Sequence, residues 1–374
     1  MGTPILFVSS FDPPLRNPHR TAEDAERTIL HSAPFAGGTG ILSGAAGVPR
    51  GPSVVVWVPA MGLGVRGMVV VGGKGGVGKT TGAAAVARGL AQRGRRVLVA
   101  MVNAKERLSD MLEVPRIGPK NTPILPGIEA VNMTPEAALE EYGVMTLRLR
   151  ALARFVFENR YVRAFLHAVP GLDAWSMLGK ATYHAIEKNG RGEFRYDTVV
   201  LDAPATGHAL SLLALPRTLS QIAPPGLLRR EAQERRDLLA DPERTEILPV
   251  TLLEDLPVTE TAELTAKLRD DLGLPVRRVV LNAVSPARFT AEEIDGLTVQ
   301  KTLADDDPLL RAARYDLHRR AIEDEQRRRL ASLVGLPTIE LPRLGRGRPR
   351  RTDIERMSEL LAERGLFAAT APPA

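Results

Sequence analysis

A glycine-rich run in this chain has the residue types and the spacing of a phosphate-binding loop. The run is Gly73-Lys74-Gly75-Gly76-Val77-Gly78-Lys79-Thr80-Thr81, and it fits the pattern Gly-x-x-x-x-Gly-Lys-Ser/Thr. Glycines let backbone N–H groups converge on phosphate oxygens, and a following helix offers unsatisfied N–H groups to the same anion. We expect Lys79 to reach the β- and γ-phosphates of ATP and the Thr80 hydroxyl to ligate Mg²⁺. An ordinary glycine-rich turn is the alternative, but the flanking elements and the Lys-Thr pair favour nucleotide binding.

A second lysine lies inside the loop, five residues before Lys79. This residue, Lys74, is typical of the deviant subclass of phosphate-binding loops. It resembles the signature lysine of that subclass, which reaches across a dimer to the nucleotide of the partner. A positive charge supplied in this way would stabilise the transferring phosphoryl group, as an arginine finger does. The alternative is that Lys74 is an ordinary surface lysine.

A carboxylate that could hold the magnesium ion follows an apolar run later in the chain. The segment Tyr196-Asp197-Thr198-Val199-Val200-Leu201-Asp202 indicates a buried strand that ends in Asp202. Such a strand is the Walker B arrangement, in which the aspartate holds Mg²⁺ directly or through water. By itself this is a weak signal, because an aspartate after a strand is common in loops.

The segments around these residues indicate an α/β fold. Apolar runs without alternation, joined through helical segments, are typical of a doubly wound, mostly parallel sheet that is covered on both faces. The loop lies between a strand at Met68–Gly72 and a helix at Thr80–Arg93. Further strands are expected at Val97–Val102, Ile128–Asn132, Thr198–Leu201, Ile247–Leu252, Arg278–Val284 and Thr338–Leu341.

The sequence suggests a nucleotide-binding domain at 67–345 that contains two helical segments and is flanked by an N-terminal extension and a C-terminal segment. Residues 1–66 are rich in Pro and Gly, so we expect a poorly ordered extension, which the natural product need not contain. A helical insertion is expected at about 134–195, with Thr134 as N-cap, and a helical segment at about 208–239. Residues 346–374 would form a basic stretch and a helix.

Composition narrows the function further. The chain has 374 residues, a net charge of +6 and no cysteine, which excludes disulfides, thiol nucleophiles and thiolate metal sites. No apolar run reaches the roughly 18–20 residues that a transmembrane helix needs, and no signal peptide is recognisable. We therefore expect a cytoplasmic protein. Most basic clusters are interleaved with acidic residues, so a solvated helix face explains them better than specific nucleic-acid binding.

Three motifs together resemble one known family. The motifs are the loop at 73–81, the segment Asp202-Ala203-Pro204-Ala205-Thr206-Gly207-His208, and Leu281-Asn282. They are similar to the ArsA-like family of arsenical pump-driving and tail-anchored-protein-targeting ATPases, in the SIMIBI class, over about residues 67–345. The resemblance implies that Thr206, Gly207 and His208 belong to switch II, which senses the γ-phosphate. It also implies that Asn282 contacts the adenine.

The chain departs from that family in its switch I and in its cysteines. The family has a catalytic Asp in the run Asp-Pro-Ala-His-x-Leu-Ser-Asp, and here the matching run extends from Asn103 to Asp110. Asn103 replaces the catalytic Asp, and a neutral amide can orient water but cannot accept its proton. Hydrolysis is therefore in doubt, although nucleotide binding is not. Without cysteines we expect no zinc at a dimer seam and no arsenite site.

These features predict an ATPase that acts as a dimeric, nucleotide-driven switch on a hydrophobic protein client. The resemblance implies a homodimer or a heterodimer with a related ATPase, with Lys74 at the seam. One alternative is a nucleotide-binding regulatory subunit with weak hydrolysis, paired with an active paralogue. Another is a positioning ATPase of the ParA/MinD type, although the Thr-Gly-His segment and the helical insertion argue against it.

Overall fold

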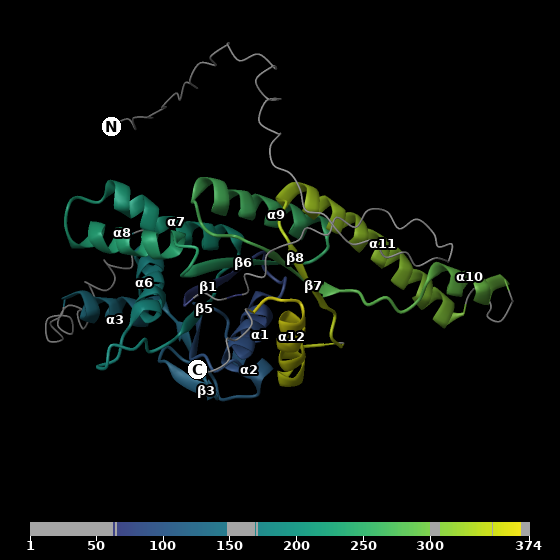
Figure 1. Ribbon diagram of the computed structural model, residues 1–374, viewed down its shortest axis with the longest axis horizontal. Helices are drawn as coiled ribbons and strands as arrows, with labels where there is room; N and C mark the ends of the chain where they lie inside the picture. Colours follow the sequence, from purple (N-terminus) through teal and green to yellow (C-terminus); the bar gives the residue numbers. More distant parts are fainter. Residues whose placement is uncertain are drawn as a thin grey trace, which may run out of the picture. The chain divides into compact units, whose positions relative to one another are not determined.

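A computed structural model describes Leu63, residues 66–147, Val169, and residues 171–299, 307–345 and 347–367. These residues belong to one compact unit, Val56–Ala374. Its strands are β1 (Gly67–Gly72), β2 (Val97–Val102), β3 (Thr122–Leu125), β4 (Ile128–Met133), β5 (Thr198–Asp202), β6 (Thr245–Thr251), β7 (Val279–Val284) and β8 (Thr338–Pro342). They form one eight-stranded sheet in the order β3-β4-β2-β5-β1-β6-β7-β8 (Figure 1).

The sheet is parallel except at one edge, which confirms the predicted α/β class. Each pairing from β4 to β8 is parallel, whereas β3 runs antiparallel to β4. The seven strands expected from the sequence all form, with ends shifted by at most two residues. The short edge strand β3 was not predicted, because its sequence Thr-Pro-Ile-Leu carries little strand signal.

Helices cover both faces of the sheet (Figure 1), and the central strands β1, β2, β5 and β6 are buried along their whole length. One face of β1, with Val69 and Val71, packs in a cluster with α1 (Lys79–Ala91), α2 (Leu108–Leu112) and α12 (Arg351–Glu363). The opposite face, with Met68 and Val70, packs with α6 (Leu172–Ile186), α7 (Thr206–Ile222), α8 (Leu227–Ala240) and α9 (Asp255–Ala266). Burial on both faces explains why the strand sequences show no polar alternation.

The C-terminal helix α12 is part of the core of this unit. Ile354, Met357 and Leu361 are buried in the same cluster as α1. The Phe367 ring covers Gly89, where a Cβ atom would come within 2.3 Å of the ring, and the Arg93 guanidinium stacks 4.5 Å from the ring centroid. Residues 347–367 therefore complete the layer over α1.

The helical segments expected at about 134–195 and 208–239 are present where the structure describes them. Helix α3 (Pro135–Leu147) begins after Thr134, whose hydroxyl accepts a hydrogen bond from the Ala137 amide. The helical segment expected at about 208–239 forms two helices, α7 and α8, which meet at Pro224-Pro225. The part of the predicted helical insertion at 148–168 lies outside the described residues, as does the extension before Leu63.

A third group of helices follows β6 and β7. After α9 come a π-helical turn, η1 (Lys267–Asp271), then α10 (Ala291–Val299) and the long helix α11 (Pro308–Val334). Several basic residues of α11 pair with acidic ones, as expected: Arg319 lies 3.1 Å from Glu323 and Arg327 lies 2.6 Å from Glu340. Within the described parts of the chain, every helix is too short or too polar to cross a bilayer.

Candidate nucleotide site

The glycine-rich run forms the turn between β1 and α1, at the carboxyl edge of the sheet. Gly73 and Gly78 have φ angles of 139° and 96°, which non-glycine residues rarely adopt. Neither position has room for a side chain, because a Cβ at Gly73 would lie 2.3 Å from the Val250 carbonyl oxygen and a Cβ at Gly78 would lie 2.2 Å from Asn282 Nδ2. At Gly75 and Gly76 a Cβ would meet no atom within 4 Å. The tip of the turn therefore borders open space that an anion could fill.

Lys79 lies along the inside of this turn. Its Nζ donates a 2.9 Å hydrogen bond to the carbonyl oxygen of Lys74. Burial lowers the pKa of Lys79, and the negative charge of Asp202 partly opposes this shift. The ammonium group is thus held against the loop, where a phosphate would need a positive charge.

Thr80 and Asp202 meet beneath the loop, although they come from different parts of the sequence. Asp202 ends β5, and the sheet register pairs it with Val71 of β1 and Met101 of β2. Thr80 Oγ1 donates a 2.7 Å hydrogen bond to Asp202 Oδ2. Burial raises the pKa of Asp202 to about 6, against the effects of Thr80 and Lys79.

The second carboxylate oxygen of Asp202 bears on metal binding. Oδ1 is buried and has no hydrogen-bond partner among the described residues. An unpartnered buried carboxylate oxygen is unfavourable in a ligand-free protein. A hydroxyl and a carboxylate are also the oxygen donors that Mg²⁺ binds in phosphate sites. Thr80 and Asp202 therefore fit a magnesium site.

Lys74 does not extend into solvent. Its Nζ forms a 3.1 Å ion pair with Glu260 Oε1, on α9 of the same chain. Sequence reasoning missed Glu260, because an acidic residue on a helix far along the chain carries no local signal of this contact.

The segment expected to be switch I follows β2, and hydrogen bonds to its backbone fix it. Asn103 is exposed, has a φ angle of 43°, and donates its backbone N–H to the Met133 carbonyl at 2.8 Å. The Asn132 side chain, on β4, forms two hydrogen bonds with the backbone of Ala104. Asn132 Nδ2 donates to the Ala104 carbonyl oxygen at 3.0 Å, and Asn132 Oδ1 accepts from the Ala104 amide at 3.2 Å. Asparagine tolerates this left-handed conformation better than most residues do. Sequence reasoning missed Asn132, which appeared as one polar residue within a strand.

Two acidic side chains of the segment from Asn103 to Asp110 have different surroundings. Glu106 accepts hydrogen bonds from the Ser109 amide at 2.8 Å and from the Ser109 hydroxyl at 2.5 Å. It therefore caps the first turn of the short helix α2, and both of its carboxylate oxygens accept hydrogen bonds from Ser109. Asp110 lies in the first turn of α2 and is exposed.

The segment expected to be switch II connects β5 to α7. Helix α7 begins at Thr206, so this residue, Gly207 and His208 occupy its first turn. The Thr206 hydroxyl is buried and has no hydrogen-bond partner among the described residues. His208 is exposed. A first helical turn four residues after Asp202 brings its backbone N–H groups to the same edge of the sheet as the loop.

Asn282 lies near the loop, within β7. Its Nδ2 donates a 2.8 Å hydrogen bond to the Val77 carbonyl oxygen, so the amide supports the loop. Asn282 also lines a cavity of about 450 Å³ with Leu252 to Glu254, with Tyr315 and Ile322 of α11, and with Arg343 after β8. This volume lies in the range of about 300–1,000 Å³ that is typical of small-molecule sites. The cavity is where a nucleoside attached to the loop-bound phosphates could lie.

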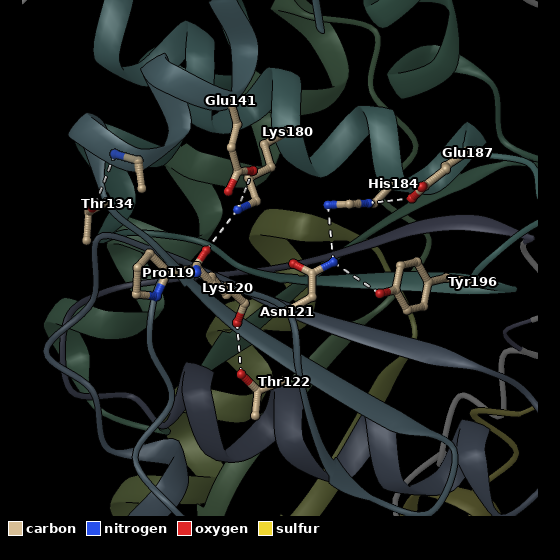
Figure 2. A network of polar contacts seen from close by, with 11 residues as sticks. Pro119, Lys120, Asn121, Thr122, Thr134, Glu141, Lys180, His184, Glu187 and Tyr196 are labelled. Atoms are coloured by element: carbon tan, nitrogen blue, oxygen red, sulfur yellow. Dashed lines mark hydrogen bonds and ion pairs between the residues drawn. The ribbon is translucent and has the colours of Figure 1, made fainter. Parts of the chain in front are cut away.

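The chain between α2 and β3 is tied to helix α6 (Figure 2). Lys180 of α6 is only 2% exposed, and its Nζ lies 2.9 Å from the Pro119 carbonyl oxygen and 2.7 Å from Glu141 of α3. Asn121 Nδ2 contacts His184 Nε2 at 3.3 Å and the Tyr196 hydroxyl at 3.0 Å.

The tautomer of His184 follows from these contacts. Burial lowers the pKa of His184 despite its 2.8 Å contact with Glu187. The ring is therefore neutral near pH 7, with Nδ1–H donating to Glu187 and Nε2 accepting from Asn121. The tie between α6 and the chain after switch I thus consists of directional hydrogen bonds, which fix the register of the two segments.

Comparisons with known proteins agree with this geometry. A family model described as anion-transporting ATPase matches residues 66–224. The ATPase BagA of Mycobacterium tuberculosis is 32% identical over 249 residues, which cover 65% of this chain and 72% of the relative. The ATPase GET3 of Kluyveromyces lactis is 31% identical over 163 residues (41% and 46%). A putative arsenical pump-driving ATPase of Halobacterium salinarum is 30% identical over 234 residues (58% and 35%).

Proposed function

This chain belongs to the ArsA-like, anion-transporting ATPase family, and from this membership we propose that it is a cytoplasmic, ATP-dependent switch. ATP with Mg²⁺ binds at the 73–81 loop, and the nucleotide state controls the association of two subunits. The observation that carries this proposal is the hydrogen bond between half-buried Thr80 and buried Asp202 beneath an open glycine turn. The pair offers oxygen donors to a cation beside a loop that offers N–H groups to phosphates.

Each polar group of the loop has a defined task in this proposal. The N–H groups around Gly75 and Gly76 bind the phosphates, and Lys79 turns from the Lys74 carbonyl to the β- and γ-phosphates. Thr80 and Asp202 hold Mg²⁺, which supplies positive charge against the phosphate oxygens when it is bound. The cavity beside Asn282 takes the nucleoside. Lys74 serves the nucleotide of the second subunit, as the resemblance to the deviant loop subclass implies.

Helices α7 and α8 provide a surface that suits a hydrophobic client. Helices α7 and α8 meet at a turn where Ile222, Leu227 and Leu228 are all exposed. Neighbouring exposed apolar residues on a helical hairpin are typical of a surface that contacts an apolar partner. The first turn of α7 also contains Thr206 to His208, so movement at the γ-phosphate would be transmitted directly to this hairpin.

One observation favours a second candidate, a regulatory subunit with weak hydrolysis. Asn103 occupies the switch I position at which the family has a catalytic Asp, and Glu106 is engaged in capping α2. A site that lacks a proton acceptor can bind ATP and close without rapid turnover. In this version the active partner is a paralogue that supplies hydrolysis.

Nucleotide binding and turnover by the purified chain test the proposal. We expect saturable, Mg²⁺-dependent binding of a fluorescent ATP analogue, lost in Lys79→Ala and retained in Lys120→Ala, an exposed lysine away from the loop. Steady-state turnover then separates the two candidates, because the regulatory subunit binds as tightly but hydrolyses slowly. No saturable binding by the wild type, or equal binding by Lys79→Ala, would refute both.

A further inference from the structure

Lys74 is held by its own chain, although the proposed function requires it to act on the nucleotide of a second subunit. We infer that Glu260 is an intramolecular latch that keeps Lys74 away from the subunit interface until nucleotide is bound. The inference rests on the proposed function, since a latch on Lys74 matters only if this lysine serves a second subunit. It adds a regulatory residue on α9 that the loop motif does not contain.

The position of Glu260 is fixed by the core. Helix α9 follows β6, which pairs directly with β1. Val258, Thr261 and Leu264 of α9 are buried at 1% exposure or less, so the helix cannot shift without opening the core. Glu260 projects from this anchored helix and meets the Lys74 ammonium at 3.1 Å. The latch therefore consists of one fixed residue and one residue on a glycine-rich turn.

The strength of the pair suits a reversible contact. The side chains of Lys74 and Glu260 are 27% and 31% exposed. Partly exposed ion pairs contribute modestly and are screened by salt. A triphosphate carries more negative charge than one carboxylate, so the phosphates of a neighbouring nucleotide would compete successfully for Lys74.

A second contact links the latch to nucleotide binding in the same subunit. The Lys74 carbonyl oxygen accepts the hydrogen bond of Lys79 Nζ. When Lys79 turns to the phosphates of a bound nucleotide, the backbone of Lys74 loses this bond while its side chain is still paired with Glu260. Nucleotide in the same subunit thus releases one of two ties on Lys74, and the nucleotide of the second subunit competes for the other. This order makes closure depend on nucleotide in both subunits.

A positioning role for Glu260 would predict the opposite effect of its loss on subunit association. If Glu260 positioned Lys74 for the reaction, its loss would weaken association of the subunits and lower turnover. If it is a latch, its loss strengthens association. Glu260→Gln separates the two roles, because it removes the charge while preserving the size of a side chain that is only partly buried.

The test measures dimerisation by sedimentation over a range of protein concentrations, with Mg²⁺ and a non-hydrolysable ATP analogue. Formation of a dimer breaks two Lys74–Glu260 ion pairs, and each pair lowers the association constant by up to about fivefold. We therefore expect Glu260→Gln to dimerise at roughly three- to twentyfold lower concentration than the wild type. Glu263→Gln is the matched control, since Glu263 is an exposed residue one turn further along α9, and it should dimerise as the wild type does.

A second readout reports the contact without nucleotide. In the ligand-free protein, amine acetylation followed by mass spectrometry should modify Lys74 several-fold faster in Glu260→Gln than in the wild type, with exposed Lys120 as internal standard. Dimerisation of Glu260→Gln at the wild-type concentration or a higher one would overturn the latch. Absence of nucleotide-dependent dimers in the wild type and both variants would instead refute the proposed function, and the latch with it.

Discussion

The hydroxyl of Thr80 donates a 2.7 Å hydrogen bond to Oδ2 of Asp202, across 122 residues of sequence. The bond joins the first turn of α1 to the last residue of β5. It leaves Oδ1 of Asp202 buried without a partner among the described residues, beside Lys79, whose charge acts on this carboxyl. The two residues are thus already in contact where we propose that a cation binds, and they give the first prediction.

Magnesium binding should weaken as the pH falls. Burial raises the pKa of Asp202 to about 6, so below this pH a proton competes with Mg²⁺ for the carboxylate. We expect Mg²⁺ affinity in the presence of ATP to approach a tenfold loss for each pH unit below about 6. Titration of Mg²⁺ with a fluorescent ATP analogue between pH 5 and pH 8 measures this. In Asp202→Asn the affinity should be low at every pH, and a pH dependence that survives this substitution would contradict the assignment.

The same carboxyl should make the ligand-free protein less stable at higher pH. Because its folded-state pKa lies above the ordinary value of 3.8, the favourable contribution of Asp202 is present below that value and is lost as pH rises through about 6. Asp202→Asn should therefore be about 1–3 kcal/mol more stable than the wild type at pH 8, and the difference should shrink as pH falls and vanish at about pH 3. Urea unfolding without nucleotide measures the difference.

A carboxyl with the opposite shift provides the control for this prediction. The hydrogen bonds and charge of Arg96 lower the pKa of Asp197, although burial opposes the shift. Its contribution is present above the ordinary value and is lost as pH falls through the folded-state pKa. Asp197→Asn should thus destabilise the protein at neutral pH and have no effect in acid. Equal pH profiles for the two variants would show that the environment of Asp202 is not as described.

The loop should not tolerate a methyl group at Gly78. This residue has a φ angle of 96°, and a Cβ would lie 2.2 Å from Asn282 Nδ2. We expect Gly78→Ala to destabilise the protein by about 2–4 kcal/mol, from left-handed strain and the clash together. Combination with Asn282→Ala should recover part of this loss, measured by thermal unfolding.

Gly75 gives a matched substitution in the same turn. A Cβ there would meet no atom within 4 Å, so Gly75→Ala should change the free energy of unfolding by less than about 0.5 kcal/mol. It should nevertheless weaken nucleotide binding, because the methyl group enters the open space of the turn. Normal nucleotide affinity in Gly75→Ala would mean that the phosphates lie elsewhere.

Lys180 should be needed to hold α6 against the chain that follows switch I. Its ammonium is buried and contacts the Pro119 carbonyl oxygen and Glu141. Lys180→Met keeps the aliphatic length but loses both contacts, so we expect a loss of about 1–3 kcal/mol. Lys120→Met, on an exposed lysine in the same segment, should cost less than about 0.5 kcal/mol. Hydrogen exchange at residues 117–121 should also rise in Lys180→Met alone.

Asn103→Asp should increase ATP turnover. The substitution restores a proton acceptor at the switch I position, and a general base typically contributes on the order of 10²-fold or more. Aspartate also tolerates the φ angle of 43° at this exposed site. Single-turnover measurements at saturating ATP should show a gain of roughly ten- to a hundredfold with unchanged nucleotide affinity. An unchanged rate would mean that Asn103 does not limit hydrolysis.

The sequence alone determined the features that depend on neighbouring residues. The glycine spacing before Lys79 predicts a loop between strand and helix, because each step needs only local backbone geometry. The apolar runs predict buried parallel strands, since burial on both faces removes polar alternation. The end of β5 at Asp202 follows from the same pattern.

Contacts between residues far apart in the chain were decided only by the tertiary structure. The strand order brings Asp202 beneath Thr80, Asn282 against Val77, and Glu260 beside Lys74. No local pattern encodes these pairs, because each depends on the three-dimensional arrangement of segments that are separated by many residues. The raised pKa of Asp202 has the same origin, since it is caused by burial in the assembled sheet.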